Sequence, residues 1–473
     1  MKGNFVWTMG KPQTLKDLKK SRYRILPLRE ELRKNLIARI KASEPLFPDI
    51  IGYDETVIPQ IENAILSGHD MIFLGERGQA KSRLIRNLAY LLDEEIPVIK
   101  GCEINDNPLA PVCKSCQEKA LKCGDSLEIE WRGREHRYAE KLATPDVTIA
   151  DLIGEIDPIK VAEGKYLSDE EAIHFGLIPR VNRGIFSINE LPDLSEKVQV
   201  GLFNIMEERD IQIKGFLVRL KLDVLIVASA NPEDYTNRGR IITPLKDRYS
   251  SQIRTHYPVA PAVESQIVEQ ERRRFGDDGY SVVMPPFMEE IITQITFLAR
   301  ESPEVNQHSG VSVRMSISNM ECLLSNAEKR AIKLDEKEAV PRITDLPSII
   351  ASTAGKLELE ALSHNGQEDK LIHHLITEAV RQTFDKYFDI GSLSGIVEAF
   401  HEGATATVSD SLTSEEYFRQ FSEIEQLASQ VESFSPDCTP AMFASVAEFI
   451  LEGLYLHDRI HKEAVGTTVR YKG

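Results

Sequence analysis

LGERGQAKSRL (residues 74–84) is the stretch that decides the fold of this chain. The segment from Gly75 to Ser82 fits G-x-x-x-x-G-K-S, the pattern of a phosphate-binding loop, except that Ala80 stands where the pattern has its last glycine. A buried strand-like run precedes the loop, and a helical pattern with one apolar side follows it. Strand, loop and helix in this order predict a nucleotide-binding site on an α/β domain.

In a loop of this kind, backbone amides and the helix N-terminus hold the phosphates. We expect Lys81 to reach the β and γ oxygens of ATP and Ser82 to bind Mg²⁺. A methyl group at Ala80 costs little if the φ of this residue stays negative. The predicted nucleotide-binding residues of the loop are Gly75, Glu76, Arg77, Gly78, Gln79, Ala80, Lys81 and Ser82.

Two further strand-like segments end in polar side chains that suit nucleotide hydrolysis. GIFSINEL contains Asn189 and Glu190, and Glu190 is the expected general base because hydrolysis needs a carboxylate to activate water. Asn189 stands where an aspartate normally supports Mg²⁺, and its uncharged amide leaves the rate of hydrolysis open. DVLIVASAN delivers Asn231, which is expected to help position the attacking water. The alternative is that Asn231 caps a turn before Pro232.

Two arginines are candidates for contacts with the phosphates. PLKDR places Arg248 after a helix at the edge of the domain, where a neighbouring subunit could use it as an arginine finger. GVSVRMSISN places Arg314 at the start of a later helix, from which we expect it to reach back to the nucleotide. Taken alone, an exposed arginine is usually a solvated charge.

The chain has 473 residues, which is more than one core usually supports. Alternating strand and helix patterns predict a parallel sheet covered by helices, and later segments show only helical periodicity. The expected parts are a basic helical arm (1–45), an α/β domain (46–258) with a cysteine-rich insertion (102–123), a helical lid (259–350) and an acidic helical region (351–473).

The charge distribution bears on the class of partner. Residues 1–50 carry 12 Lys and Arg against 5 Asp and Glu, whereas residues 351–473 carry 9 against 20, and the net charge is -17. The acidic end repels phosphate backbones, so nucleic-acid binding is disfavoured there. The basic N-terminal segment is the only candidate for such binding, and its preferred interpretation is a solvated arm or helix. No apolar run reaches the roughly 20 residues of a membrane span, and the N-terminus lacks the apolar core of a signal peptide. We therefore expect a cytoplasmic location.

The ordered set of motifs resembles AAA+ ATPases, and more narrowly the ATPase subunit I of magnesium chelatase and the related MoxR group. The resemblance covers about residues 45–335 and is carried by LIGEID, NRGIFSINELPDLSEKVQVGLFNIMEERDIQIKG, ASANPED, PLKDR and SGVSVRMSISN. It implies an α/β nucleotide-binding domain with hairpin insertions, a helical lid, hexameric rings and a partner with a von Willebrand A domain. It also implies that Ile51, Gly52 and Tyr53 line the adenine pocket, and that MEERDIQIKGFLVRLKLD forms a hairpin that transmits nucleotide state to a partner.

Several functions fit this resemblance. The first hypothesis is an ATP-hydrolysing remodelling machine. A MoxR-like chaperone is preferred slightly over a true magnesium-chelatase subunit of tetrapyrrole biosynthesis, because the chain shows no porphyrin site. A transcription activator is disfavoured, because neither a GAFTGA loop nor a C-terminal helix-turn-helix signal is present. A nucleotide-dependent structural ring with little turnover stays open because of Asn189.

Four cysteines lie within 22 residues: Cys102, Cys113, Cys116 and Cys123, with the spacing C-x10-C-x2-C-x6-C. Four thiolates can form a tetrahedral Zn²⁺ site, although only one C-x2-C knuckle is present. Free reduced thiols and a redox role are the alternatives. A cytosolic location argues against structural disulfides.

Overall fold

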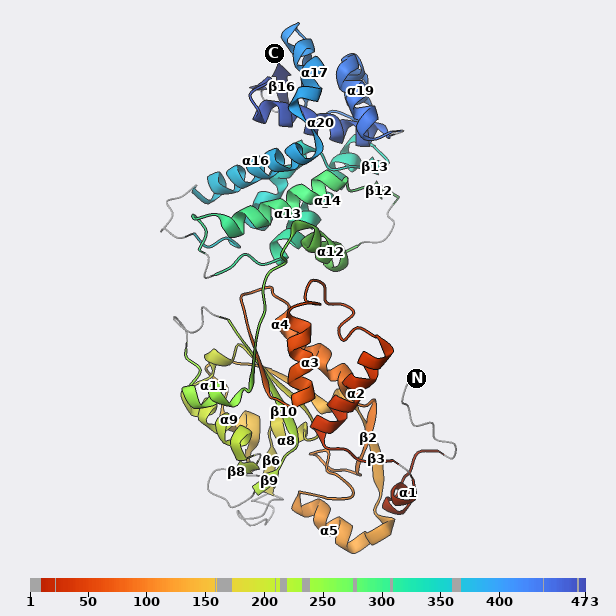
Figure 1. Ribbon diagram of the computed structural model, residues 1–473, viewed down its shortest axis with the longest axis vertical. Helices are drawn as coiled ribbons and strands as arrows, with labels where there is room; N and C mark the ends of the chain where they lie inside the picture. The colour runs from red at the N-terminus through yellow and green to blue at the C-terminus, as the bar shows by residue number, and fades with distance from the viewer. Residues whose placement is uncertain are drawn as a thin grey trace. The chain divides into compact units, whose positions relative to one another are not determined.

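The computed structural model of the chain divides into two compact units, Met1–His256 and Tyr257–Gly473 (Figure 1). Each unit has its own core and is described by itself. The structure describes residues 10–21, 23–157, 159, 172–208, 210–212, 219–231, 239–274, 279–306, 309–359, 367–436, 438–465 and 468–473.

A five-stranded sheet with the order β11-β1-β10-β7-β4 forms the centre of the first unit. All four pairs of neighbouring strands are parallel. The strands are β1 (Met71–Leu74), β4 (Tyr138–Leu142), β7 (Gly184–Asn189), β10 (Val224–Ala230) and β11 (Ser251–Arg254). Because the strands are parallel, their carboxyl ends meet at one edge of the sheet, which is where ligands bind in such folds.

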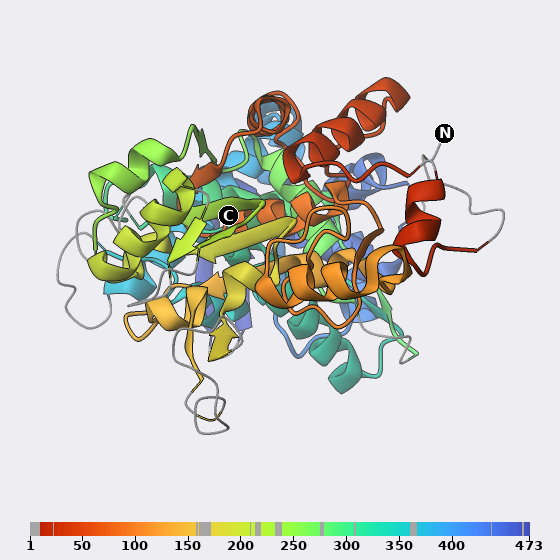
Figure 2. The ribbon, with the colours of Figure 1, turned by 90° about the horizontal axis from the view of Figure 1, so that it is seen from below.

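Helices cover both faces of this sheet, as Figures 1 and 2 show. Along β10, Leu225 and Val227 belong to one apolar cluster while Ile226 and Ala228 belong to the other, as the alternation of a strand buried on both faces requires. The first face is covered by α2 (Leu28–Ala42), α3 (Val57–Ser67), α4 (Lys81–Asn87) and η1 (Leu88–Leu91). The second face is covered by α6 (Ile149–Ile153), α8 (Leu177–Arg180), η5 (Leu191–Asp193), α9 (Glu196–Glu208) and α11 (Thr243–Arg248).

The N-terminal segment differs from the solvated arm that its charge suggests. Leu28, Leu32 and Leu36 of α2 are buried in the core of the first unit. Glu31 accepts two hydrogen bonds from the guanidinium of Arg137, at 2.8 and 2.7 Å, and both side chains are buried. Losing one partner of such a pair costs about 3–5 kcal/mol, so α2 is an integral part of this unit.

Three small antiparallel pairs extend from the first unit. The elements are α1 (Leu15–Lys20), β2 (Glu95–Ile99) paired with β3 (Ile129–Gly133), α5 (Lys114–Cys123), η2 (Gly124–Ser126), η3 (Arg134–Arg137), β5 (Gly154–Ile156) paired with β6 (Ile173–Phe175), and β8 (Asp210–Gln212) paired with β9 (Arg219–Lys221). β8 and β9 are the two arms of the hairpin expected from the sequence. Its expected turn at Lys214 and Gly215 lies outside the described residues.

The second unit is mainly helical. Its elements are α12 (Pro261–Glu271), β12 (Ser281–Val282), α13 (Pro286–Glu301), α14 (Arg314–Leu334), β13 (Glu338–Ala339), η6 (Ile343–Ile349), α15 (Ile350–Thr353), α16 (Gln367–Tyr387), η7 (Ile390–Leu393), α17 (Ser394–His401), β14 (Thr405–Val408), α18 (Ser414–Ser422), α19 (Glu425–Phe434), α20 (Pro440–Leu456), β15 (His461–Val465) and β16 (Thr468–Lys472). The sequence did not indicate the antiparallel sheet β14-β16-β15 or the short pair of β12 and β13.

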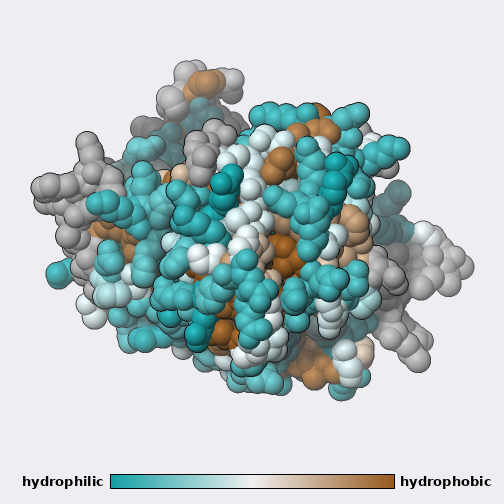
Figure 3. All heavy atoms as spheres, turned by 90° about the horizontal axis from the view of Figure 1, so that it is seen from above, coloured by the Kyte–Doolittle hydropathy of each residue, from teal (hydrophilic) through white to brown (hydrophobic). Residues whose placement is uncertain are grey.

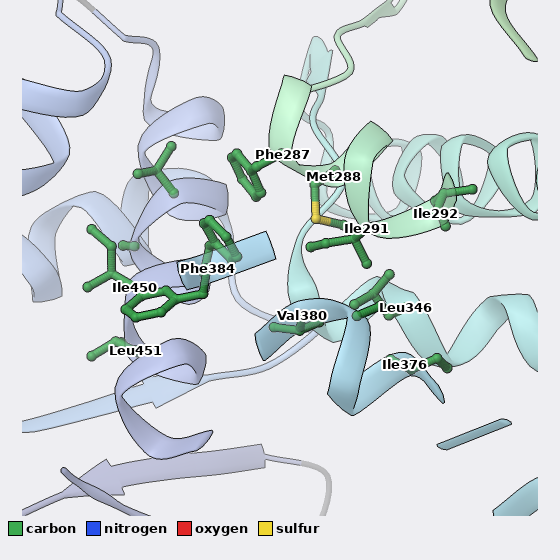
Figure 4. Packing of buried hydrophobic residues seen from close by; sticks show 14 of the residues in the cluster. Phe287, Met288, Ile291, Ile292, Leu346, Ile376, Val380, Phe384, Ile450 and Leu451 are labelled. Atoms are coloured by element: carbon green, nitrogen blue, oxygen red, sulfur yellow. The ribbon is translucent and has the colours of Figure 1, made fainter. Parts of the chain in front are cut away.

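One apolar core joins the expected lid to the expected C-terminal region. Figure 4 shows Phe287 and Ile291 of α13 packed near Phe384 of α16 and Ile450 of α20. The rings of Phe287 and Phe449 stack with their centres 4.4 Å apart. The two segments that the sequence separates near residue 350 are therefore parts of one compact unit.

The surface view of Figure 3 shows mostly hydrophilic residues, with apolar ones in small patches. Among the described residues, no helix combines the length and the apolar character that crossing a bilayer requires.

Candidate functional site

The strand register brings the predicted catalytic side chains together. Leu74 of β1 pairs with Ala230 of β10, so the phosphate loop and Asn231 begin side by side. Ala228 of β10 pairs with Ile188 of β7, which places Glu190 level with Ala230. The loop, Asn231 and Glu190 therefore meet at the carboxyl edge of the sheet.

A chain of hydrogen bonds connects Lys81, Asn231 and Glu190. The ammonium of Lys81 donates to the carbonyl oxygens of Gly75 and Glu76 and to Oδ1 of Asn231, each at 2.6 Å. Nδ2 of Asn231 donates to Oε2 of Glu190 at 2.7 Å. Asn231 thus joins the expected phosphate-binding cation to the expected general base, instead of only capping a local turn.

The side chain of Gln79 stabilises the phosphate loop by hydrogen bonds within it. Its Oε1 accepts hydrogen bonds from the amide of Glu76 at 3.0 Å and from Oγ1 of Thr255 at 2.7 Å. A Cβ atom at Gly75 would lie 2.0 Å from Oγ1 of Thr255 and 2.2 Å from Oε1 of Gln79, so only glycine fits there. Arg77 is exposed, and Gly78 has a φ of +76°.

The condition under which Ala80 would cost little, a negative φ, is not met. Ala80 has a φ of +54° and a ψ of +15°, in the left-handed region, and it is the residue that precedes α4. The loop must reverse direction there, and this conformation costs an L-residue about 1–2 kcal/mol relative to the right-handed one. Ala80 therefore keeps the backbone path that glycine would take, at a conformational cost.

One of the two expected metal-binding residues, Asn189, lies next to a carboxylate that the sequence analysis missed. Asn189 is buried, its Nδ2 donates to Oε1 of Glu140 on β4, and its Oδ1 accepts from Oγ of Ser229 at 3.2 Å. Arg86 donates two hydrogen bonds to Glu140, at 2.7 and 2.9 Å, and this contact lowers the pKa of the Glu140 carboxyl. Ser82 is the second residue of α4 and is half-buried.

Tyr53 acts on the loop through its hydroxyl group. The ring is buried, which raises the pKa of Tyr53, and the hydroxyl lies 3.0 Å from the carbonyl oxygen of Gln79 and 2.8 Å from that of His256. Ile51 and Gly52 precede it and are partly buried. Tyr53 therefore ties the phosphate loop to the last residue of the first unit. That Ile51, Gly52 and Tyr53 line an adenine pocket stays a prediction.

Arg248 lies at the edge of the sheet opposite the phosphate loop. It ends α11 three residues before Ser251, and Ser251 pairs with Met71 at the start of β1. The length of β1, about 10 Å at 3.3 Å per residue, separates that edge from the loop. The guanidinium forms an ion pair with Glu207 and lies 5.4 Å from the ring centre of Phe203. Its side chain is 40% exposed, so a second molecule can contact it.

Arg314 is exposed and opens α14 in the second unit. Its expected contact with the nucleotide stays a prediction, as do the catalytic roles of the other residues.

Three of the four neighbouring cysteines come together, and the fourth does not. Cys102, Cys113 and Cys116 are buried, whereas Cys123 is exposed. Asp106, a buried residue that the sequence analysis did not select, takes the fourth position of the cluster. Hydrogen bonds from the thiols of Cys113 and Cys116 lower the pKa of Cys102. The expected ligand set with Cys123 is therefore wrong.

The residues at the carboxyl edge fit a nucleotide with its Mg²⁺. A cavity of about 380 Å³ lies beside the loop, and Lys246 and Arg254 add positive charge to a lining that includes Gly75 and Gln79. Lys246 lies in the PLKDR motif, where only Arg248 was selected, and Arg254 lies on β11 outside the quoted motifs. Mg²⁺ prefers oxygen ligands, which Ser82 and the neighbouring carboxamide and carboxylate groups can offer.

Comparisons with known proteins agree with this architecture. The magnesium-chelatase subunit ChlI of Nostoc sp. is 29% identical over 268 residues, which cover 55% of this chain and 66% of that protein. ChlI of Anabaena variabilis is 29% identical over 241 residues, which cover 50% of this chain and 65% of that protein. A ChlI homologue from Methanocaldococcus jannaschii is 28% identical over 211 residues, covering 41% and 52%. This chain thus spans about half to two thirds of the length of these relatives.

No family model matches the chain. Among solved structures, a complex between subunits BchI and BchD of magnesium chelatase is 18% identical, covers 69% of this chain and 98% of that chain, and has a TM-score of 0.34. That score shows only a loose likeness.

A phosphate loop after the first strand of a five-stranded parallel sheet, with polar groups at the ends of its neighbours, defines a P-loop fold of the AAA+ class. The fold class expected from the sequence is confirmed. Within that class, the chain is similar to the AAA+ ATPases of the magnesium-chelatase subunit I and MoxR group.

Proposed function

We propose that the chain binds and hydrolyses ATP with Mg²⁺ at the carboxyl edge of its sheet. The observation that carries the proposal is the hydrogen-bonded chain from Lys81 through Asn231 to Glu190. Lys81 neutralises the phosphates, Glu190 accepts the proton of the attacking water, and Asn231 holds that water in line. Mg²⁺, bound by Ser82 and through Asn189, supplies charge neutralisation at the phosphate oxygens.

The proposed working form is a homo-oligomeric ring, with a hexamer as the expected state. Arg248 ends α11 close to the amino end of β11, away from its own phosphate loop, which favours a role at the nucleotide of a neighbouring chain. In the ring, Arg248 contributes to the site of the neighbouring chain, and Arg314 contributes from the second unit.

The energy of hydrolysis is proposed to drive remodelling of a partner with a von Willebrand A domain, in a chaperone-like role. The hairpin arms β8 and β9 are the proposed lever, because they continue directly from α9, which follows Glu190. The competing function is the ATPase subunit of a magnesium chelatase, favoured by the names of the relatives. A cytoplasmic location suits both functions.

The test is ATP turnover by Glu190→Gln. The amide can still accept the hydrogen bond from Asn231 but cannot accept a proton, so we expect normal ATP binding and turnover at least about tenfold slower. Glu128→Gln, at an exposed position paired with Lys100, is the control and should turn over normally. Equal turnover by both variants would assign the base to another residue.

A further inference from the structure

A buried cluster of three thiols and one carboxylate lies apart from the nucleotide site. One ligand atom each from Cys102, Asp106, Cys113 and Cys116 lies within 4.8 Å of all the others. In a tetrahedral zinc site, with bonds of about 2.3 Å to sulfur and about 2.0–2.2 Å to oxygen, ligand atoms stand about 3.4–3.8 Å apart. A small contraction around an ion therefore turns this cluster into such a site.

Backbone amides already point at two of the sulfur atoms. The amide of Ile104 donates to Sγ of Cys102, and the amide of Cys116 donates to Sγ of Cys113, both at 3.4 Å. Cys113 is the N-cap of α5, so its C-x2-C turn directs both thiols to the same side. Donors of this kind stabilise negative charge on sulfur and orient the ligands of a metal site.

Backbone amides hold the carboxylate of Asp106 in the cluster. Its carboxylate accepts the amides of Asn107, Val112 and Cys113 at 2.9–3.0 Å. These amides fix the carboxylate with one of its oxygens among the three sulfur atoms, and the Cys113 thiol is a further neighbour that an ion would replace. A disulfide between two of the thiols would leave the third thiol and this buried carboxylate unexplained.

We propose that Cys102, Cys113, Cys116 and Asp106 bind one zinc ion. Soft thiolates select Zn²⁺ over Mg²⁺ and Ca²⁺, and Zn²⁺ accepts a carboxylate as a tetrahedral ligand. The surroundings are apolar, since the three cysteines belong to the same core cluster as Ile104 and Leu127. A closed set of four protein ligands is the mark of a structural site.

A cavity gives the ion access to the cluster, and the bound ion would stabilise the position of α5. A cavity of about 190 Å³ adjoins the three cysteines, with Lys119 of α5 and Phe175 of β6 in its lining. Zinc fixes the start of α5 to the loop that follows β2, and so pins the cysteine-rich insertion to the first unit beside the β5–β6 hairpin.

The first experiment measures metal in the full-length protein purified without chelators. Mass spectrometry of the metal content is expected to give about one zinc per chain. Cys116→Ser should lose it, whereas Cys123→Ser should keep it, because Cys123 lies on the same helix but is exposed. Asp106→Asn should bind zinc more weakly than the wild type, because the amide carries no negative charge to offer the ion.

A second measurement needs no variant. Replacing zinc with Co²⁺ in the wild-type chain should give near-ultraviolet thiolate-to-metal absorption and the strong visible bands of a tetrahedral ion, and chelator should lower the unfolding temperature. A wild-type protein that holds no zinc and takes up no Co²⁺ would overturn the proposal. Loss of zinc in Cys123→Ser would overturn the ligand set.

Discussion

Asn231 holds Glu190 by a hydrogen bond of 2.7 Å from its Nδ2 to Oε2 of the carboxylate. The other atom of the same amide, Oδ1, accepts from the ammonium of Lys81. One carboxamide therefore contacts both the cation that is expected to meet the phosphates and the base that is expected to activate water. A ligand that draws Lys81 away frees one side of Asn231, so this residue is placed to report the state of the phosphates to Glu190.

Lys81→Ala is expected to lose most of the affinity for ATP. Lys81 is buried within the loop and brings positive charge next to its carbonyl groups, where the phosphates are expected to bind. Calorimetric titration with ATP should show Kd rising at least about tenfold, which corresponds to about 1.4 kcal/mol. Lys100→Ala removes an exposed lysine paired with Glu128 and should leave Kd unchanged. Equal affinity in the Lys81 variant would refute the assignment of the phosphate loop.

Ala80→Gly is expected to stabilise the first unit. Ala80 has a φ of +54°, and glycine adopts that region without the penalty of a Cβ atom. Denaturant unfolding should show a gain of about 1 kcal/mol. Ala38→Gly, at an exposed interior position of α2, is the control and should lose about 0.5–1 kcal/mol. A loss of similar size in both variants would show that Ala80 is not strained.

The fold was predictable because its signals are local. The phosphate loop, the strand that ends at Asn189 and the strand that ends before Asn231 each carry a pattern within about ten residues, and parallel pairing brings their ends together. The sign of φ at Ala80 was not predictable, because the path of the loop sets it. Glu140 lies on a strand without a motif, and only the sheet order places it next to Asn189.

The members of the cysteine cluster were likewise only partly predictable from the sequence. Spacing alone suggested Cys123 as a ligand, but Cys116 and Cys123 lie seven residues apart on one helix, α5. At 1.5 Å per residue this separates them by about 10.5 Å along the axis, too far to share one ion. Asp106 reaches the cluster through the turn of the loop that precedes α5, for which the sequence offered no pattern.

Asn189→Asp alone is expected to raise the rate of ATP hydrolysis little. The sequence alone suggested that an aspartate would keep or raise the rate of hydrolysis by restoring charge near Mg²⁺. In the structure, however, the amide of Asn189 donates to Glu140, and an aspartate would place two carboxylates against each other. Arg86 offsets part of that repulsion, so we expect a loss of roughly 1–2 kcal/mol in unfolding free energy.

The double variant Asn189→Asp/Glu140→Gln keeps the added negative charge near Mg²⁺ but removes the repulsion between the carboxylates at positions 189 and 140. The glutamine at position 140 can donate to the aspartate at position 189, which restores the hydrogen bond in the reverse direction. We expect stability to return toward the wild-type value and ATP turnover to equal or exceed it, measured by denaturant unfolding and phosphate release. Glu140→Gln alone is the control. A single Asn189→Asp variant as stable as the wild type would contradict the proposed repulsion.

Arg248→Ala tests whether sites are shared between chains. Arg248 ends α11 close to the amino end of β11, away from its own phosphate loop, so we expect it to act on a neighbour's nucleotide. The variant should fold and bind ATP normally but lose turnover by roughly 10³-fold. Glu207→Ala breaks the same ion pair and keeps the guanidinium, so it should retain turnover. If Glu207→Ala is equally inactive, the ion pair matters for structure rather than catalysis.

Mixing Arg248→Ala with Glu190→Gln gives the sharper result. Each variant is expected to be inactive alone, because every interface in its ring lacks either the arginine or the base. In a mixed ring, some interfaces combine Glu190 of one chain with Arg248 of the next, so phosphate release should partly recover as subunits exchange. Recovery should follow the ratio of mixing and vanish at concentrations where sedimentation shows monomers. Full turnover by monomeric Arg248→Ala would exclude the shared site, because no second chain would then be present to supply the arginine.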